Sequence, residues 1–172
     1  MTFYDLVKQQ FMYGGKKYAH DEVREATDIL FEKHGKNWLI GTVDKYCFRY
    51  KNLKQEKDLL KIACYQYILW LKRGFFVMPN GINSPAIDTN VKIKEEMFPE
   101  FLHRYELAKT IKEKQYYGDW TNIDTISNLL GDFSHKEWPE LTQDNLFTVF
   151  YYAQKEWEET FKDVEVHNTD CK

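Results

Sequence analysis

Apolar residues recur three and four positions apart along most of the chain, which is the spacing of amphipathic helices. Between residues 54 and 73 the pattern changes: beyond Lys61 the segment is apolar nearly all round, as in a central buried helix. We therefore predict an all-α protein in which a central helical hairpin is packed by flanking helices. The expected helices span approximately residues 2–14, 21–35, 37–50, 54–73, 99–118, 121–131 and 142–161.

Residues typical of helix ends support these limits. Thr2 with Asp5, and Thr121 with Asp124, have the spacing at which an N-cap side chain meets the third helical residue. Pro99 suits the first turn of its helix, where no backbone donor is needed. The expected N-caps are Thr2, Asp21, Thr121 and Thr142, and the expected stops are Gly14, Gly35, Gly74, Gly118 and Gly131.

The helical pattern is interrupted between residues 75 and 90. Pro79-Asn80-Gly81 and Ser84-Pro85 are typical of turns, and Phe75-Phe76-Val77 suits a short strand. We therefore predict one irregular loop or small hairpin insertion. The chain then divides into a helical core at 1–74 that carries the hairpin, a connector at 75–94, a C-terminal helical half at 95–164 that packs on the core, and a frayed tail at 165–172.

The composition predicts a packed, soluble protein. Hydrophobic residues make up 43%, aromatic residues 17% and charged residues 30%, which favours a core over disorder. A net charge of −3 argues against a nucleic-acid partner, although basic residues gather between positions 45 and 61. The three cysteines form no C-x-x-C pair, and no apolar run is long enough to span a membrane. We expect a cytoplasmic protein with no membrane partner.

The hairpin carries the candidate chemistry. Lys45 and Arg49 lie four residues apart, and Asp58 and Lys61 lie three apart, so each pair shares a helix face. Folding the two helices against each other would bring three cations and a carboxylate together. Such a cluster is either a structural ion-pair clasp or a phosphate site.

For the phosphate site the residues suggest specific roles. Lys45, Arg49 and Lys61 would bind phosphates, and Arg49 and Asp58 are the candidate catalytic residues. Asp58 with Glu56 would hold a magnesium ion. Tyr46 and Tyr65 are the candidates for stacking on a nucleobase.

These same positions resemble a family of small phage proteins. The family shares G-N-x-x-K-Y-x-x-R, a basic linker and D-L-x-K-A-x-x-Y, and its short-tailed coliphage member works as a nucleoside monophosphate kinase without a P-loop. Thr42 replaces the family's asparagine and Ile62 its alanine. The resemblance implies a phage-type, nucleotide-binding, kinase-like protein. The matching residues are Gly41, Lys45, Tyr46, Arg49, Asp58, Leu59, Lys61 and Tyr65.

A second resemblance involves other residues. The segment from Tyr13 to Tyr18, with Asn37-Trp38, is similar to the Y-G-x-x-K-Y and N-W elements of phage dATP/dGTP diphosphohydrolase N-terminal domains. All-α pyrophosphohydrolases more broadly bind magnesium through an E-x-x-E helix and a second carboxylate pair. The carboxylates available for that arrangement here are Glu22, Glu25, Glu56 and Asp58.

Three functions therefore stay open from the sequence. The first is phosphoryl transfer to a (deoxy)nucleoside monophosphate, and the second is an all-α nucleoside triphosphate pyrophosphohydrolase. The third is a non-catalytic phage or mobile-element protein that binds and modulates a host protein. Self-association into a homo-oligomer is also expected, because hairpins of this size often bury their open side against a copy.

Overall fold

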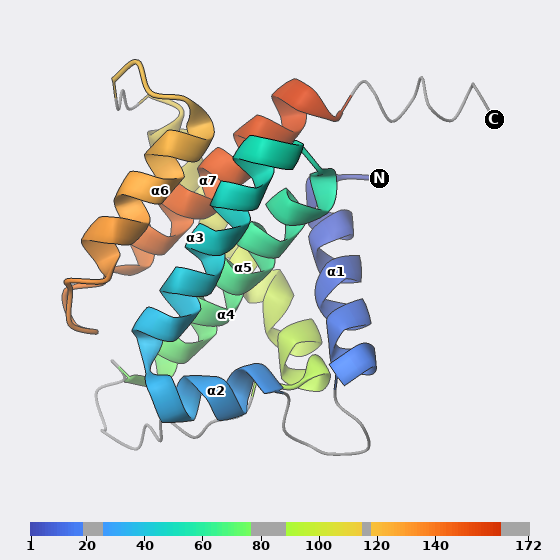
Figure 1. Ribbon diagram of the computed structural model, residues 1–172. Helices are drawn as coiled ribbons and strands as arrows, with labels where there is room; N and C mark the ends of the chain where they lie inside the picture. Colours follow the sequence, from blue (N-terminus) through green and yellow to red (C-terminus); the bar gives the residue numbers. More distant parts are fainter. Residues whose placement is uncertain (19–25, 77–88, 115–117, 163–172) are drawn as a thin grey trace.

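The structure, a computed structural model, describes residues 1–18, 26–76, 89–114 and 118–162 (Figure 1). Within these ranges the chain forms seven α-helices and no strand, which confirms the predicted all-α fold. None of these helices is both long and apolar enough to cross a membrane. The helices are α1 (Phe3–Tyr18), α2 (Ala26–His34), α3 (Lys36–Leu53), α4 (Glu56–Phe76), α5 (Val91–Lys112), α6 (Asn122–Phe133) and α7 (Gln143–Thr160).

Side chains cap several helices as the sequence predicts. At α1, the Asp5 backbone N–H donates to Thr2 Oγ1 at 3.2 Å, and the Thr2 backbone nitrogen donates to Asp5 Oδ2 at 3.0 Å. The Thr121 hydroxyl caps α6, and Thr142 forms a reciprocal capping box at α7. These bonds satisfy backbone donors that have no partner within the helix, so the local sequence defines these three starts.

Other helix ends differ from the predictions. α1 continues past Gly14, and α4 continues past Gly74 to Phe76. The predicted strand is therefore wrong for Phe75 and Phe76, which are helical. A helix-stop glycine ends a helix only when no tertiary packing favours its continuation. The predicted cap Asp21, the turn prolines and Val77 lie outside the described residues.

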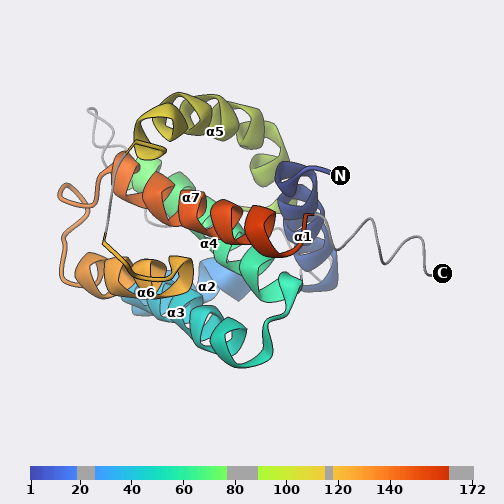
Figure 2. The ribbon, with the colours of Figure 1, turned by 90° about the horizontal axis from the view of Figure 1, so that it is seen from above.

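α5 starts earlier than predicted. The Asn90 side chain caps it, accepting from the Ile93 backbone N–H at 3.0 Å, so the last part of the predicted 75–94 connector is helical. Pro99 consequently lies inside the helix, where it removes one backbone hydrogen bond and favours bending. The ribbon of α5 is curved in the view from above (Figure 2). The helix ends at Lys112, before the predicted stop at Gly118.

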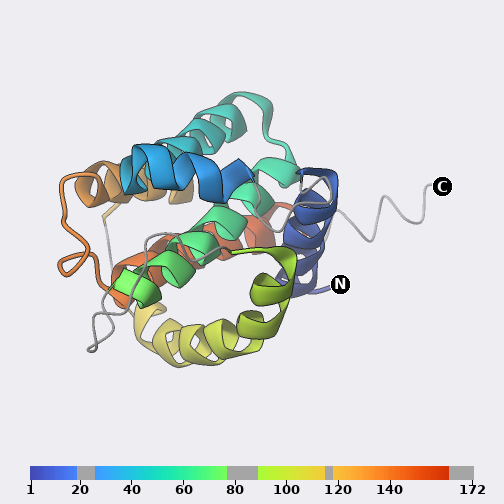
Figure 3. The ribbon, with the colours of Figure 1, turned by 90° about the horizontal axis from the view of Figure 1, so that it is seen from below.

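α4 lies at the centre of the molecule. It packs along α3 on one side and α7 on another, while α1 crosses it, and α6 lies against both α3 and α7 (Figures 1 and 2). Because α4 and α7 pack together, the C-terminal half lies against the N-terminal core. α2 runs across the end of the bundle, against α3 (Figure 3).

Aromatic rings fill the space between α5 and the central helices. Phe101 of α5 is the hub of this cluster: its ring centroid lies 4.9 Å from that of Tyr67, 5.3 Å from Trp70 and 5.0 Å from Phe150. Edge-to-face and offset ring pairs of this kind add to the stabilisation from burial. Much of the high aromatic content therefore belongs to the core.

A buried ion pair fastens α2 to α4. Lys72 Nζ lies 2.7 Å from Asp28 Oδ1, and both side chains are almost completely buried. Thr89 completes the cluster, because its backbone N–H and its hydroxyl both donate to the Asp28 carboxylate, at 2.9 and 2.7 Å. The carboxylate thus joins α2, α4 and the residue that precedes the cap of α5. The Lys72 ammonium also lies 5.0 Å from the centre of the Phe31 ring.

Replacing Asp28 by asparagine should strongly destabilise the fold. Asp28→Asn removes the charge of the carboxylate that the buried Lys72 ammonium contacts, and breaking a buried ion pair in this way typically costs about 3–5 kcal/mol. Chemical denaturation should show this loss, and the double variant Asp28→Asn with Lys72→Met should recover part of it. Asp124→Asn is the control, since it breaks the exposed Lys51–Asp124 pair and should cost about 1 kcal/mol or less. Equal stability of Asp28→Asn and the native chain would contradict the assigned role.

Candidate functional site

The turn between α3 and α4 determines which side chains of the hairpin meet. Lys54 adopts a left-handed conformation, with φ of 53°, and its backbone N–H donates to the Tyr50 carbonyl at 2.8 Å. This C-cap ends α3 in one residue, and α4 begins at Glu56. The short connection places the second half of α3 against the first half of α4.

The hairpin gathers the three predicted phosphate-binding residues around one tyrosine ring. Lys45 Nζ lies 5.1 Å, Lys61 Nζ 5.0 Å and Arg49 Cζ 5.9 Å from the centre of the Tyr46 ring. The ring's electron-rich face attracts cations and so reduces the cost of their mutual repulsion. Lys45 is exposed, and Arg49 and Lys61 are half-buried, so a solvent-borne anion can reach the group.

Asp58, the carboxylate predicted to join this group of cations, is fully buried. Neither of its carboxylate oxygens accepts a hydrogen bond. The nearest cation is Arg49, whose Nε lies 3.8 Å from Asp58 Oδ1. Asp58 therefore approaches Arg49 through Nε, and no described residue accepts a hydrogen bond from the terminal guanidinium nitrogens of Arg49. Asp58 can orient the Arg49 side chain in this way, while the terminal N–H groups of Arg49 remain available to a ligand.

Asp58 and Glu56 are not arranged as a magnesium site. The Glu56 carboxylate accepts a hydrogen bond from Trp157 Nε1 at 2.9 Å, which directs it toward α7. Asp58 is enclosed next to Arg49, and magnesium needs accessible oxygens and room for its own waters. No three acidic, histidine or cysteine side chains cluster as a metal site within the described ranges. Glu22 and Glu25, the other predicted metal ligands, lie outside them.

The two predicted base-stacking residues stack on each other. The Tyr46 and Tyr65 ring centroids are 5.8 Å apart and the ring planes differ by 11°. Burial raises the pKa of the Tyr65 hydroxyl, and the neighbouring Tyr46 raises it further, so the Tyr65 hydroxyl remains neutral at physiological pH. A base does not fit between two rings already in contact. Tyr46 serves instead as the platform for the cations, and Tyr65 lines a neighbouring cavity.

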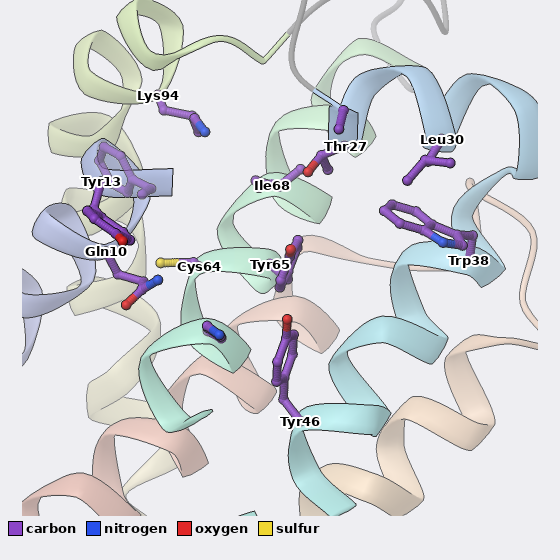
Figure 4. Close-up of a pocket in the computed structure, with 13 residues that line it drawn as sticks. Gln10, Tyr13, Thr27, Leu30, Trp38, Tyr46, Cys64, Tyr65, Ile68 and Lys94 are labelled. Carbon is purple, nitrogen blue, oxygen red and sulfur yellow. The ribbon is translucent and has the colours of Figure 1, made fainter. Parts of the chain in front are cut away.

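That cavity has a volume of about 280 Å³ and lies beside the hairpin, where α1, α2, α3, α4 and the start of α5 meet (Figure 4). Its size is near the lower end for small-molecule sites in proteins. Tyr46 and Lys61 line both the cavity and the cation cluster, so the two features adjoin. Other lining residues are the aromatic Phe11, Tyr13, Trp38 and Tyr65, the polar Gln10 and Thr27, and the cationic Lys94.

Several of these lining residues were not predicted as site residues. Tyr13 and Trp38 appeared only within the second resemblance, yet they border the same cavity as Tyr46 and Tyr65 of the first. The burial of Lys94 could have been predicted from the sequence. Lys94 lies four and seven residues before Phe98 and Phe101, so it occupies the same, buried face of α5. No comparable pattern in the sequence indicated that Gln10 and Thr27 would line a cavity.

The arrangement combines an accessible group of cations with an aromatic cavity. Chemically, it can bind a planar apolar group that carries an anionic substituent. The two described cysteines, Cys47 and Cys64, are buried, and burial raises the pKa of both thiols, so neither is an activated nucleophile. Comparison of the chain with protein-family models, with curated proteins and with solved structures finds no match.

Proposed function

We propose that this protein is a phage-type nucleotide-handling protein that binds a nucleotide at the α3–α4 hairpin. Lys45, Arg49 and Lys61 hold its phosphates, and the base occupies the adjoining aromatic cavity. The observation that carries the proposal is the convergence of these three cations on Tyr46, directly beside that cavity.

The charge balance favours a ligand over a purely structural clasp. A clasp would pair each cation with a carboxylate, but Lys45 forms no ion pair with any described residue, and Arg49 meets Asp58 only at 3.8 Å. Within the described residues, Lys45 therefore keeps a positive charge that no carboxylate offsets, in a chain whose net charge is −3. A local excess of positive charge of this kind attracts phosphates.

The cavity favours a nucleotide over a bare anion. Aromatic walls would not contribute to the binding of inorganic phosphate, whereas a nucleobase would stack on them and bury its apolar surface against them. Some residues of each phage resemblance line this one space, which supports a nucleotide as their common ligand. They are Tyr46, Lys61 and Tyr65 of the first resemblance and Tyr13 and Trp38 of the second.

For the reaction we favour phosphoryl transfer to a nucleoside monophosphate. Such transfer depends chiefly on holding the phosphates and neutralising charge, and the Arg49 fork is suited to both. Asp58 acts as a positioning residue for Arg49. Magnesium, when bound, would neutralise phosphate charge, but we assign it no ligand among the described carboxylates.

Pyrophosphohydrolysis is the second candidate, because Tyr13 and Trp38 lie in the cavity wall. Incubation with ATP and a nucleoside monophosphate, followed by chromatography, separates the candidates. A kinase forms ADP only when the acceptor monophosphate is present, whereas a pyrophosphohydrolase releases pyrophosphate from a triphosphate alone. We expect acceptor-dependent ADP. Binding without turnover, together with capture of a host protein, would favour the non-catalytic modulator.

Nucleotides should raise the melting temperature, because a ligand that binds only the folded form stabilises it. A panel of nucleoside mono-, di- and triphosphates, with and without magnesium, tests this by thermal shift. Lys45→Ala should reduce the shift, since it removes an exposed cation from the cluster. Lys51→Ala is the matched control, because it removes an exposed lysine of the same helix whose ammonium contacts Asp124 instead. Equal shifts in the native chain and both variants would argue against the phosphate site.

Arg49→Ala should weaken nucleotide binding at least about tenfold, as expected for loss of a charge-assisted contact. It should also lower the melting temperature, because Asp58 loses its neighbouring cation. Adding Asp58→Asn to the same variant should restore the melting temperature without restoring affinity, as measured by calorimetry. If the double variant bound nucleotide normally, Arg49 would be only a structural partner of Asp58.

A further inference from the structure

Lys94 is a buried cation in the wall of the cavity. Only 3% of its surface is exposed, although lysine is rarely buried to this extent. It belongs to the first turns of α5, whereas the cations discussed above come from α3 and α4. The Tyr67 hydroxyl donates to the Lys94 carbonyl at 2.7 Å, which ties this turn of α5 to the centre of α4.

Lys94, Lys61 and Cys64 line the same cavity. Burial raises the pKa of Cys64 to about 12, and the charges of Lys94 and Lys61 each act in the opposite direction. Figure 4 shows Lys94, Cys64 and Gln10 on one side of Tyr65, and Trp38 and Leu30 on the other.

The cavity is thus polar at one end and apolar at the other. The end formed by α1 and α5 carries Lys94, and the end formed by α2 and α3 carries Leu30 and Trp38 (Figure 4). Lys61 of α4 also lines the cavity. Mainly apolar walls lower the effective dielectric constant, so a cation there attracts an anion more strongly than an exposed one does. A ligand with a phosphate at one end and an aromatic ring at the other matches this polarity.

We propose that Lys94 is a further phosphate-binding residue, acting with Lys61 so that the ligand's phosphate lies beside Cys64 and its base lies toward Trp38. This inference rests on the proposed nucleotide function and gives the ligand a direction within the cavity. It also gives α5 a part in the site, since Lys94 of this helix supplies one of the ligand's contacts.

Calorimetry on the full chain tests the assignment, with nucleoside 5′-monophosphates and the corresponding uncharged nucleosides as probes. Lys94→Met should weaken binding of the best monophosphate at least about tenfold and leave the affinity for its nucleoside unchanged. Lys92→Met is the matched control, because Lys92 is exposed on the same turn of α5 and should have no effect on either probe. Trp38→Leu should weaken the nucleoside and the monophosphate equally.

The outcomes separate this inference from the function on which it rests. If the native chain binds no nucleotide, the proposed function fails. If the native chain binds monophosphates and Lys94→Met binds them equally well, only the role of Lys94 is overturned. Lys94→Gln provides a second variant if Lys94→Met does not fold. Failure of both to fold would also overturn the inference, because it would assign Lys94 to the fold alone.

Discussion

The enclosure of α4 is the constraint on which the rest of the structure depends. A helix that is apolar nearly all round is stable in water only when other helices cover every side. In this protein α3, α7 and α1 provide that cover, and aromatic rings from α5 fill the space that remains. The two halves of the chain therefore share one core, and the hairpin is held against it as a rigid element.

Enclosure leaves few polar groups inside, and two of them contrast. The Asp28 carboxylate accepts from Lys72 and twice from Thr89, so its charge is fully compensated. The Asp58 carboxylate is equally buried but accepts no hydrogen bond from the described residues, and the Arg49 Nε lies 3.8 Å away. A satisfied buried ion serves the fold, whereas an incompletely satisfied one beside a half-exposed arginine is the kind of feature that occurs at functional sites.

The candidate site has two parts with different origins. The cation cluster belongs to a single hairpin, and its geometry follows from a short turn and from side chains on facing helices. The cavity is assembled from five helices, so its shape depends on how α1, α2 and α5 pack around that hairpin. Together they place a group of cations beside an aromatic cavity, which neither part provides alone.

The sequence by itself determined the helical class, three of the capped helix starts, the burial of α4 and the meeting of Lys45, Arg49 and Lys61. These features depend on periodicity and on contacts between adjacent helices, both of which are encoded over short distances.

Only the tertiary structure showed that Tyr46 stacks on Tyr65, that Glu56 turns toward Trp157, and that Lys94 lines the cavity. It also revealed the Asp28–Lys72 pair and the continuation of α4 beyond Gly74. Each of these features depends on which side chains from different helices pack together. Helical spacing specifies the face on which a residue lies, but not which residue of another helix it meets.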